Sequence, residues 1–119
     1  MGRRILVVDD EPQIRRIMRA VLVAKRYEVL EAESGEDALR YILSGLCDLV
    51  LLDINMPGIS GIEVCREVRS SFDKPIIIMS AGEENKAKAL DAGANDYLKK
   101  PFSVSELFSC VKSHLGEPG

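Results

Sequence analysis

Five short apolar runs separated by longer segments constrain the fold of this 119-residue chain more than any other feature. The runs cover residues 5–8, 27–30, 49–52, 75–79 and 97–98. Their brevity and β-branched content favour strands, and the segments between them have helical periodicity. Signals that can start a helix precede or open four of these segments: Pro12, Ser34, Ser60 and Ser103. The length and the unbroken alternation predict one domain over residues 1–119.

The middle runs, LVLLD and PIIIMS, are apolar on successive residues rather than on alternate ones. This pattern is typical of strands covered on both faces, as in a parallel sheet between two layers of helices. Right-handed crossovers between such strands give a doubly wound α/β domain. Apolar stripes at helical spacing predict which residues of the first and last helices face the sheet: Ile14, Ile17 and Val21, then Val104, Leu107, Phe108, Val111 and Leu115.

The composition argues against several classes of function. The chain has 16 Lys and Arg against 19 Asp and Glu, so a nucleic-acid surface built on excess positive charge is not expected. Cys47, Cys65 and Cys110 fit no CxxC pair, zinc cluster or disulfide framework, which predicts reduced, mostly buried thiols and a cytoplasmic location. The first apolar run is too short for a signal peptide or a membrane span.

Acidic residues stand where the expected strands end. Asp9 and Asp10 follow the first strand and Asp53 closes the third. Because parallel strands place their carboxyl ends at one edge of the sheet, we expect these acids to converge with Ser80 and Lys100. Three carboxylates at one place raise one another's pKa unless a cation lies among them, and oxygen ligands select Mg²⁺ or a similar ion. The pattern therefore implies a metal site.

A simpler interpretation is that acids at strand ends only cap the following helices. Asp9 and Asp10, placed before Pro12, fit that interpretation about equally well. The third acid, Asp53, and Lys100 favour a reactive site instead of helix caps alone. An aspartate can act as a nucleophile and form an acyl phosphate while Mg²⁺ and an ammonium group neutralise the phosphoryl oxygens.

Four segments resemble the signature segments of response-regulator receiver domains: ILVVDDEP, LVLLDINMPGISGIE, PIIIMSAG and GANDYLKKPF. The resemblance covers essentially the whole chain, and each segment falls at the carboxyl end of an expected strand. It implies a flavodoxin-like sheet of five parallel strands in the order 2-1-3-4-5, flanked by five helices. It also implies a signalling switch of a two-component system that is not an enzyme, since it catalyses only its own phosphorylation and dephosphorylation.

The resemblance assigns roles around the acceptor. Asp53 would take a phosphoryl group from a phosphohistidine of a sensor histidine kinase or phosphotransfer protein. Asp10 and Asp53 would ligate Mg²⁺ (or Mn²⁺) directly, and Asn55 would add its backbone carbonyl. Asp9 would act through a bound water.

Further roles concern the phosphoryl group itself. Lys100 rather than Lys99 would be its partner, because the family motif places that lysine immediately before Pro101, after a peptide bond that is cis in the family. Ser80 occupies the hydroxyl switch position. Tyr97 occupies the aromatic switch position and is expected to turn inward when Ser80 is drawn toward the phosphate. The fourth helix, expected at roughly 83–92, has few apolar contacts and should be easily displaced.

The segment LDAGANDYLKKPFSVSEL also resembles the winged-helix transcription-factor subfamily of receivers. Such receivers dimerise through the fourth helix, fifth strand and fifth helix and precede a DNA-binding domain, so we expect an effector beyond this chain and a role in transcription. Cys110 stands where that subfamily usually has an arginine partner for acids near Asp96, so only a weak homodimer is expected. His114, the one histidine, is expected to face solvent far from the acids.

Two other classes of protein share this architecture. A Mg²⁺-dependent phosphohydrolase of the haloacid-dehalogenase type would need a DxDxT signature after the first strand, which is missing. A flavodoxin-like cofactor binder would need a hydroxyl- and glycine-rich loop there, whereas Asp9, Asp10 and Glu11 would repel a phosphate. The glycines form neither a GxGxxG nor a Walker loop, so nucleotide binding has no support.

Overall fold

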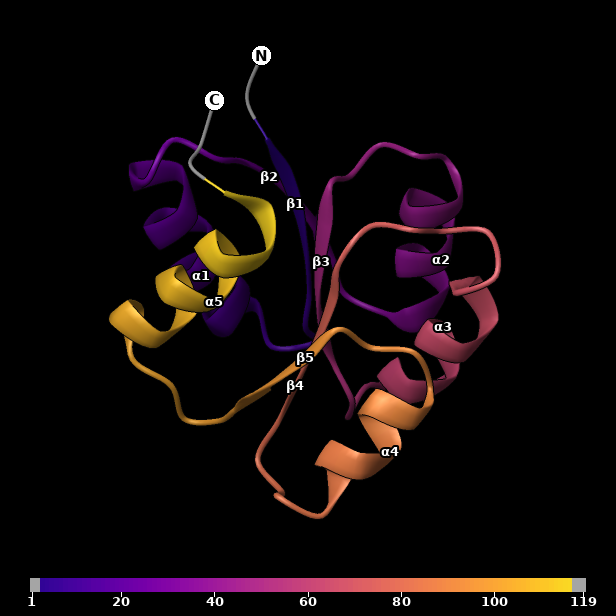
Figure 1. Ribbon diagram of the computed structural model, residues 1–119. Helices are drawn as coiled ribbons and strands as arrows, with labels where there is room; N and C mark the ends of the chain where they lie inside the picture. The colour runs from indigo at the N-terminus through magenta and orange to yellow at the C-terminus, as the bar shows by residue number, and fades with distance from the viewer. Residues whose placement is uncertain (1–2, 117–119) are drawn as a thin grey trace.

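Five parallel strands form the centre of the computed structural model, which describes residues 3–116 (Figure 1). Their spatial order is β2-β1-β3-β4-β5, which confirms the predicted doubly wound α/β sheet. The second strand lies slightly later than the expected 27–30. The strands are β1 (Arg4–Val8), β2 (Glu28–Ala32), β3 (Leu49–Asp53), β4 (Ile76–Ser80) and β5 (Asp96–Lys99).

Five helices cover the sheet, with α1 and α5 on one face and α2, α3 and α4 on the other (Figure 1). Ser34, Ser60 and Ser103 each accept a hydrogen bond from a backbone N–H of the first turn, as their positions predicted. The fourth helix begins later than expected and lacks a side-chain cap. The helices are α1 (Pro12–Ala24), α2 (Gly35–Leu43), α3 (Gly61–Val68), α4 (Asn85–Asp91) and α5 (Val104–Leu115).

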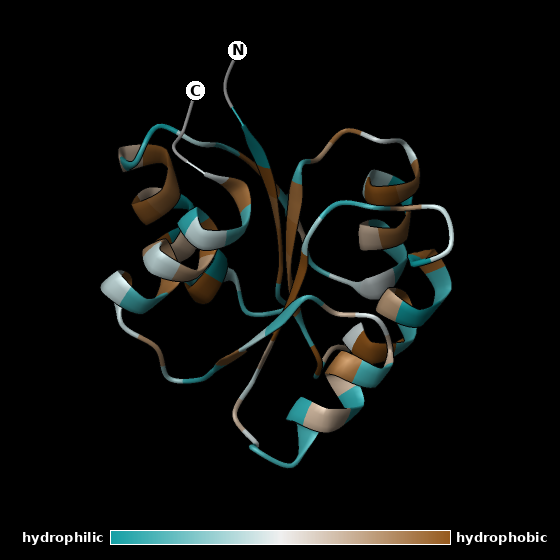
Figure 2. Cartoon of the chain, viewed as in Figure 1, coloured by the Kyte–Doolittle hydropathy of each residue, from teal (hydrophilic) through white to brown (hydrophobic). Residues whose placement is uncertain are grey.

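The core consists of two apolar clusters, one on each face of the sheet. Every residue of β3 and β4 is buried, and Figure 2 shows the central strands coloured as hydrophobic. This explains their unbroken apolar runs, because both faces of these strands are covered by helices. Within residues 3–116, no helix has the length and apolar character needed to cross a bilayer.

The predicted core stripes of α1 and α5 were wrong at two positions. Ile17 is 60% exposed and Val104 is 53% exposed. Met18 and Leu22 are the buried residues of α1, so the face that packs on the sheet is rotated from the one predicted. The helical period was correct, but apolar residues on neighbouring positions left the choice of face open. An exposed isoleucine on α1 therefore needs another explanation.

The connection after β3 brings the chain back to the end of that strand. Gly61, the first residue of α3, donates its N–H to the Ile54 carbonyl at 3.1 Å. A Cβ atom at Gly61 would lie 2.2 Å from the backbone oxygen of Asp53. Only glycine fits this approach, because the opposing atom is backbone and cannot rotate away.

We predict that Gly61→Ala destabilises the protein by about 1 to 3 kcal/mol, the usual cost of overpacking. Gly82→Ala is the matched control, because the three atoms nearest to its Cβ would all belong to the Glu84 carboxyl group, at the end of a flexible side chain. Urea unfolding followed by circular dichroism measures both variants. Equal stability of Gly61→Ala and Gly82→Ala would contradict the close approach at Asp53.

Candidate phosphoacceptor site

Three carboxylates converge at the carboxyl edge of the sheet. Asp9 and Asp10 follow β1, and Asp53 is the last residue of β3. A carboxylate oxygen from each lies within 4.8 Å of the others. Asp9 and Asp53 are buried, with 0% and 4% of their surface exposed, whereas Asp10 is exposed. The expected convergence of the three acids is confirmed, and two of them are buried.

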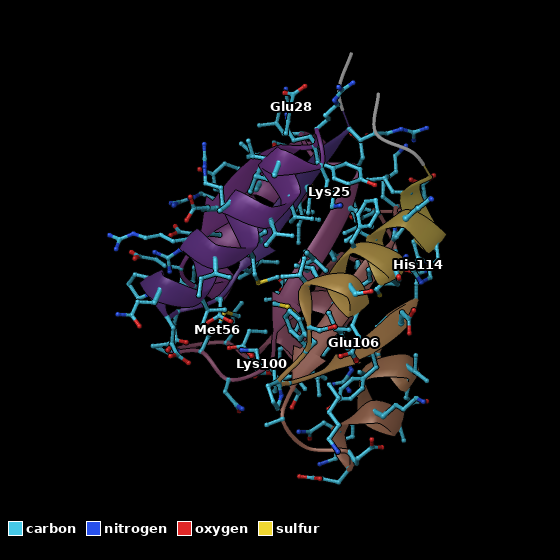
Figure 3. All side chains as sticks on the ribbon, turned by 90° about the vertical axis from the view of Figure 1, so that its left-hand side faces the viewer. Lys25, Glu28, Met56, Lys100, Glu106 and His114 are labelled. Carbon is cyan, nitrogen blue, oxygen red and sulfur yellow. The ribbon has the colours of Figure 1, made fainter. Side chains whose placement is uncertain are left out.

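Lys100 completes this group. Its Nζ lies 2.8 Å from Asp9 Oδ2 and 3.2 Å from Asp53 Oδ1. Its backbone N–H donates to the Ser80 carbonyl at 2.8 Å, and the Lys100–Pro101 peptide bond is cis. Figure 3 shows Lys100 near Met56, at the end of the sheet where the loop after β3 lies. The lysine reaches Asp9 and Asp53 from the strand at one edge of the sheet.

Lys99 is directed elsewhere, and its Nζ lies 3.6 Å from Glu83 Oε1. The two neighbouring lysines thus point in different directions, with Lys99 exposed and Lys100 half-buried. The structure therefore places Lys100, rather than Lys99, among the acids.

The electrostatics of the group follow from burial and from an excess of negative charge. Burial and the neighbouring Asp9 carboxylate raise the pKa of Asp53 to about 6, although Lys100 acts in the opposite direction. Burial disfavours the charged form of Lys100, but its bonds to Asp9 and Asp53 outweigh this and raise its pKa. One ammonium group stands against three carboxylates, and their hard oxygen atoms are the ligands that Mg²⁺ prefers. The residues therefore fit a divalent cation.

The two predicted switch residues are joined through the loop after β4. Ser80 is buried, and its Oγ accepts hydrogen bonds from Asn85 Nδ2 at 3.0 Å and from the Gly82 N–H at 3.3 Å. The half-buried Tyr97 donates its hydroxyl to the carbonyl of Gly82 and, at 3.4 Å, to that of Ser80. Asn55 is exposed in the loop that follows Asp53. The contacts of Asn85 with Ser80 were not predicted.

His114 does not face solvent, so that prediction was wrong. Its side chain is 24% exposed, and Nε2 lies 2.8 Å from Asp96 Oδ2. Asp96 therefore has a partner although Cys110 replaces the expected arginine. The spacing of Cys110 and His114 could have indicated this, because residues four apart on a helix share a face. As predicted, Cys47 and Cys65 are buried and all three cysteines are free thiols.

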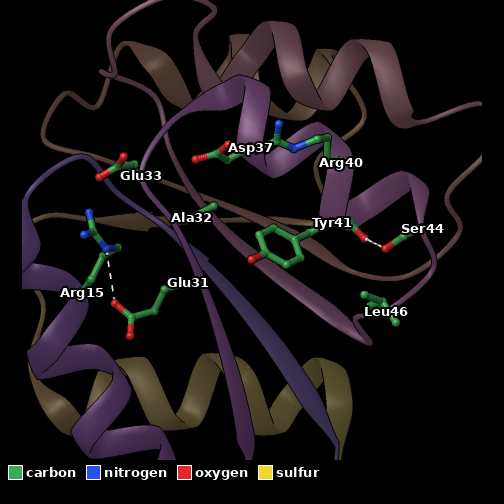
Figure 4. Close-up of a pocket in the computed structure, with 9 residues that line it drawn as sticks. All are labelled: Arg15, Glu31, Ala32, Glu33, Asp37, Arg40, Tyr41, Ser44 and Leu46. Carbon is green, nitrogen blue, oxygen red and sulfur yellow. Dashed lines mark hydrogen bonds and ion pairs between the residues drawn. The ribbon is translucent and has the colours of Figure 1, made fainter.

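The surface of the described chain has several cavities, and two of them are lined in part by residues of α1. One of about 670 Å³ lies between α1, β2 and α2 and includes none of the predicted site residues (Figure 4). Arg15 and Glu31 form an ion pair on its wall, at 3.3 Å. The other, of about 430 Å³, adjoins Lys100 and is mostly apolar. Its lining residues are Ile14, Ile17, Met18, Ala81, Lys100, Pro101 and Phe102.

Residues 5–112 match the family model of the response regulator receiver domain. The chain belongs to this receiver family. The transcriptional regulatory protein ResD of Bacillus subtilis (strain 168) is 47% identical to this receiver over 114 residues, which are 94% of the chain and 48% of ResD. The receiver therefore spans about half the length of this curated relative.

Solved structures of other receivers share the fold. TrrA from Thermotoga maritima, in complex with Mg²⁺–BeF, is 45% identical, with a TM-score of 0.88 and coverage of 95% of this chain and 99% of TrrA. The BeF3-activated N-terminal receiver domain of RstA from Klebsiella pneumoniae is 31% identical, with a TM-score of 0.89 and coverage of 94% and 97%. These likenesses confirm the predicted family and the flavodoxin-like fold.

The raised pKa of Asp53 predicts a pH dependence of stability. The folded chain holds a proton on Asp53 up to about pH 6, while an unfolded chain releases it near pH 4. Stability is therefore lost as the pH rises between these values. With a chelator present to remove divalent cations, we expect the free energy of unfolding of Asp53→Asn to exceed that of wild type at pH 7 by on the order of 2 kcal/mol. At pH 4 the difference should be much smaller.

Urea unfolding at both pH values measures this difference. Asp73→Asn, at an exposed position, serves as the matched control and should show no comparable change between pH 4 and pH 7. A stabilisation of Asp53→Asn that is equal at the two pH values would contradict the prediction.

Proposed function

We propose that this receiver, over residues 1–119, is the phosphoacceptor switch of a two-component system and that Asp53 takes the phosphoryl group. The observation that carries the proposal is the contact of Lys100 Nζ with both Asp9 and Asp53 at the carboxyl edge of the sheet. This arrangement puts a fixed positive charge beside a buried carboxylate that is ionised at neutral pH.

In the proposed transfer, a carboxylate oxygen of Asp53 forms a bond to phosphorus. The bond between phosphorus and the histidine nitrogen of the donor breaks, and its electron pair stays on that nitrogen. Lys100 balances charge on the phosphoryl oxygens, and the Ser80 hydroxyl donates to one of them. Asp10 and Asp53 would hold Mg²⁺ or Mn²⁺ directly, with Asp9 acting through water. When bound, the ion neutralises further phosphoryl charge.

The Asn55 backbone carbonyl is the proposed third direct ligand, and it lies two residues after the acceptor, in the loop that follows β3. The mixture of carboxylate and carbonyl oxygens suits Mg²⁺, which demands oxygen ligands and keeps several waters. The TrrA complex with Mg²⁺–BeF, in a receiver 45% identical to this one, supports the choice of ion.

The switch residues suggest how phosphorylation is transmitted. A hydroxyl group has one proton to donate and two lone pairs, so Ser80 can bond to a phosphoryl oxygen and still accept from Asn85. Movement of the loop after β4 would carry Gly82 with it, and Gly82 holds the Tyr97 hydroxyl. The signal would thus reach α4 and β5. We propose that α4, β5 and α5 control an output domain beyond this chain, or a partner.

The likeness to ResD, a transcriptional regulatory protein of which the chain covers 48%, supports transcription as the output. A following DNA-binding domain is what the resemblance to the winged-helix subfamily implies. The receiver itself would make no contact with nucleic acid and would form at most a weak homodimer. It would act in the cytoplasm, where a reducing environment keeps the three thiols free.

Asp53→Asn should abolish phosphorylation while leaving the fold intact, because the amide lacks the anionic nucleophile. The measurement is mass spectrometry after incubation with acetyl phosphate and Mg²⁺, which also maps the modified residue. Asp73→Asn is the control and should be labelled like wild type. Undiminished labelling of Asp53→Asn would refute the assignment of the acceptor.

The apolar cavity beside Lys100 supports a protein as the natural phosphodonor. Ile17 lines it and is 60% exposed. Exposed apolar groups next to a reactive site commonly mark a protein contact. A sensor histidine kinase or phosphotransfer protein could bury this group, whereas a small phosphodonor has no need of it.

We therefore expect Ile17→Asp to slow phosphotransfer from an autophosphorylated histidine kinase by about tenfold or more, the loss from about 1.4 kcal/mol of buried apolar contact. Labelling by acetyl phosphate should be unchanged. Val23→Asp, also exposed on α1 but outside the cavity, is the matched control. Equal rates from the kinase for Ile17→Asp and wild type would exclude this surface as the contact.

A further inference from the structure

Three side chains that phosphotransfer does not use meet at the amino end of β5. Asp96 is the first residue of β5, and Cys110 and His114 lie on α5. One ligand atom from each lies within 4.8 Å of the others, and none of the three residues is fully exposed. The acceptor carboxylates lie at the opposite, carboxyl ends of their strands. This cluster is therefore separate from the phosphoacceptor site.

The helix places two of the three residues. Cys110 and His114 are four residues apart, which puts them on the same face of α5. That face is turned toward β5, where Cys110 Sγ lies 3.7 Å and His114 Nε2 lies 2.8 Å from Asp96 Oδ2. Figure 3 shows His114 on α5, well separated from Lys100. Nitrogen and sulfur thus approach one carboxylate oxygen.

We propose that Asp96, Cys110 and His114 bind one Zn²⁺ ion, or another divalent transition-metal ion of similar preference. Imidazole nitrogen, thiolate sulfur and carboxylate oxygen are the three ligand types that zinc uses in proteins. Around tetrahedral zinc, such ligand atoms stand about 3.3 to 3.6 Å apart. The observed 2.8 and 3.7 Å lie close to this range, and the sulfur and nitrogen atoms lie within 4.8 Å of each other.

The carboxylate is already oriented for this role. The Tyr97 backbone N–H donates to Asp96 Oδ1 at 2.8 Å, which leaves Oδ2 facing the histidine and the cysteine. Partial burial opposes ionisation of Asp96, but the bonds from His114 and Tyr97 outweigh it and lower its pKa. A fixed second oxygen is the usual support of a carboxylate that binds a metal.

The sulfur and nitrogen ligands separate this site from the acidic one. Mg²⁺ prefers oxygen ligands alone, whereas thiolate and imidazole select zinc and its neighbours. Burial and the Asp96 carboxylate raise the pKa of the Cys110 thiol to about 12, so zinc would displace the thiol proton to solvent as it binds. Three protein ligands leave a fourth position for water. The inference does not rest on the proposed phosphotransfer.

The test uses Co²⁺ as a spectroscopic probe in place of Zn²⁺, on the reduced 119-residue chain with excess Mg²⁺ present. A thiolate bound to Co²⁺ gives a near-ultraviolet charge-transfer band that carboxylates do not give. We expect this band to saturate at one Co²⁺ per chain and to vanish on addition of Zn²⁺. Absence of the band in the wild-type chain would overturn the proposal, whatever the behaviour of the variants.

Variants identify the ligands. Cys110→Ser should remove the band, and His114→Gln and Asp96→Asn should each weaken Co²⁺ binding by about tenfold or more. Cys47→Ser is the matched control for the thiol, and Asp53→Asn is the control for the acidic group; both should keep the band at wild-type affinity. Circular dichroism checks that each variant is folded. Unchanged Co²⁺ binding in both His114→Gln and Asp96→Asn, or loss of the band in Cys47→Ser, would contradict the site.

Discussion

The contact of one ammonium group with two buried carboxylates is the interaction on which this structure depends. Lys100 lies between Asp9 and Asp53, and both acids are almost completely hidden from water. Burying such charges is expensive unless each finds a partner. The lysine compensates only in part, since the pKa of Asp53 stays raised to about 6. The remaining excess of negative charge makes this edge of the sheet suited to a divalent cation.

The order of the strands makes that contact feasible. β1 and β3 are neighbours, so Asp9 and Asp53 lie side by side, but β4 stands between them and β5. Lys100 follows β5 directly, its backbone N–H bonds to the Ser80 carbonyl at the end of β4, and its side chain reaches Asp9 and Asp53. Ser80 thus holds the backbone of Lys100 while its own hydroxyl faces the loop after β4. Ser80 therefore contributes both to placing the lysine that compensates the acids and to the contacts of the switch loop.

The opposite end of β5 has a different chemistry. Asp96 is engaged by His114 and Cys110 of α5. These contacts fasten α5 to the strand that also carries Tyr97, one residue further on. The two ends of a four-residue strand therefore connect to the acidic site and to the cluster on α5. Any change that moves β5 acts on both.

The sequence by itself determined the alternation of strands and helices, the parallel sheet and the residues at the carboxyl edge. Unbroken apolar runs in β3 and β4 require cover on both faces, and acids at strand ends must meet once the strands are parallel. Serine caps fixed where three of the helices begin, because their hydrogen bonds are local.

Only the tertiary structure decided what depends on contacts between distant residues. Local periodicity could not choose the buried face of α1, because Ile17 and Met18 are both apolar and only the fit to the sheet buries one of them. It could not pair His114 with Asp96, which are 18 residues apart and come together only when α5 packs beside β5. It could not give the burial that raises the pKa of Asp53. Strand and helix come from neighbours in the chain, whereas burial, pairing and charge balance come from neighbours in space.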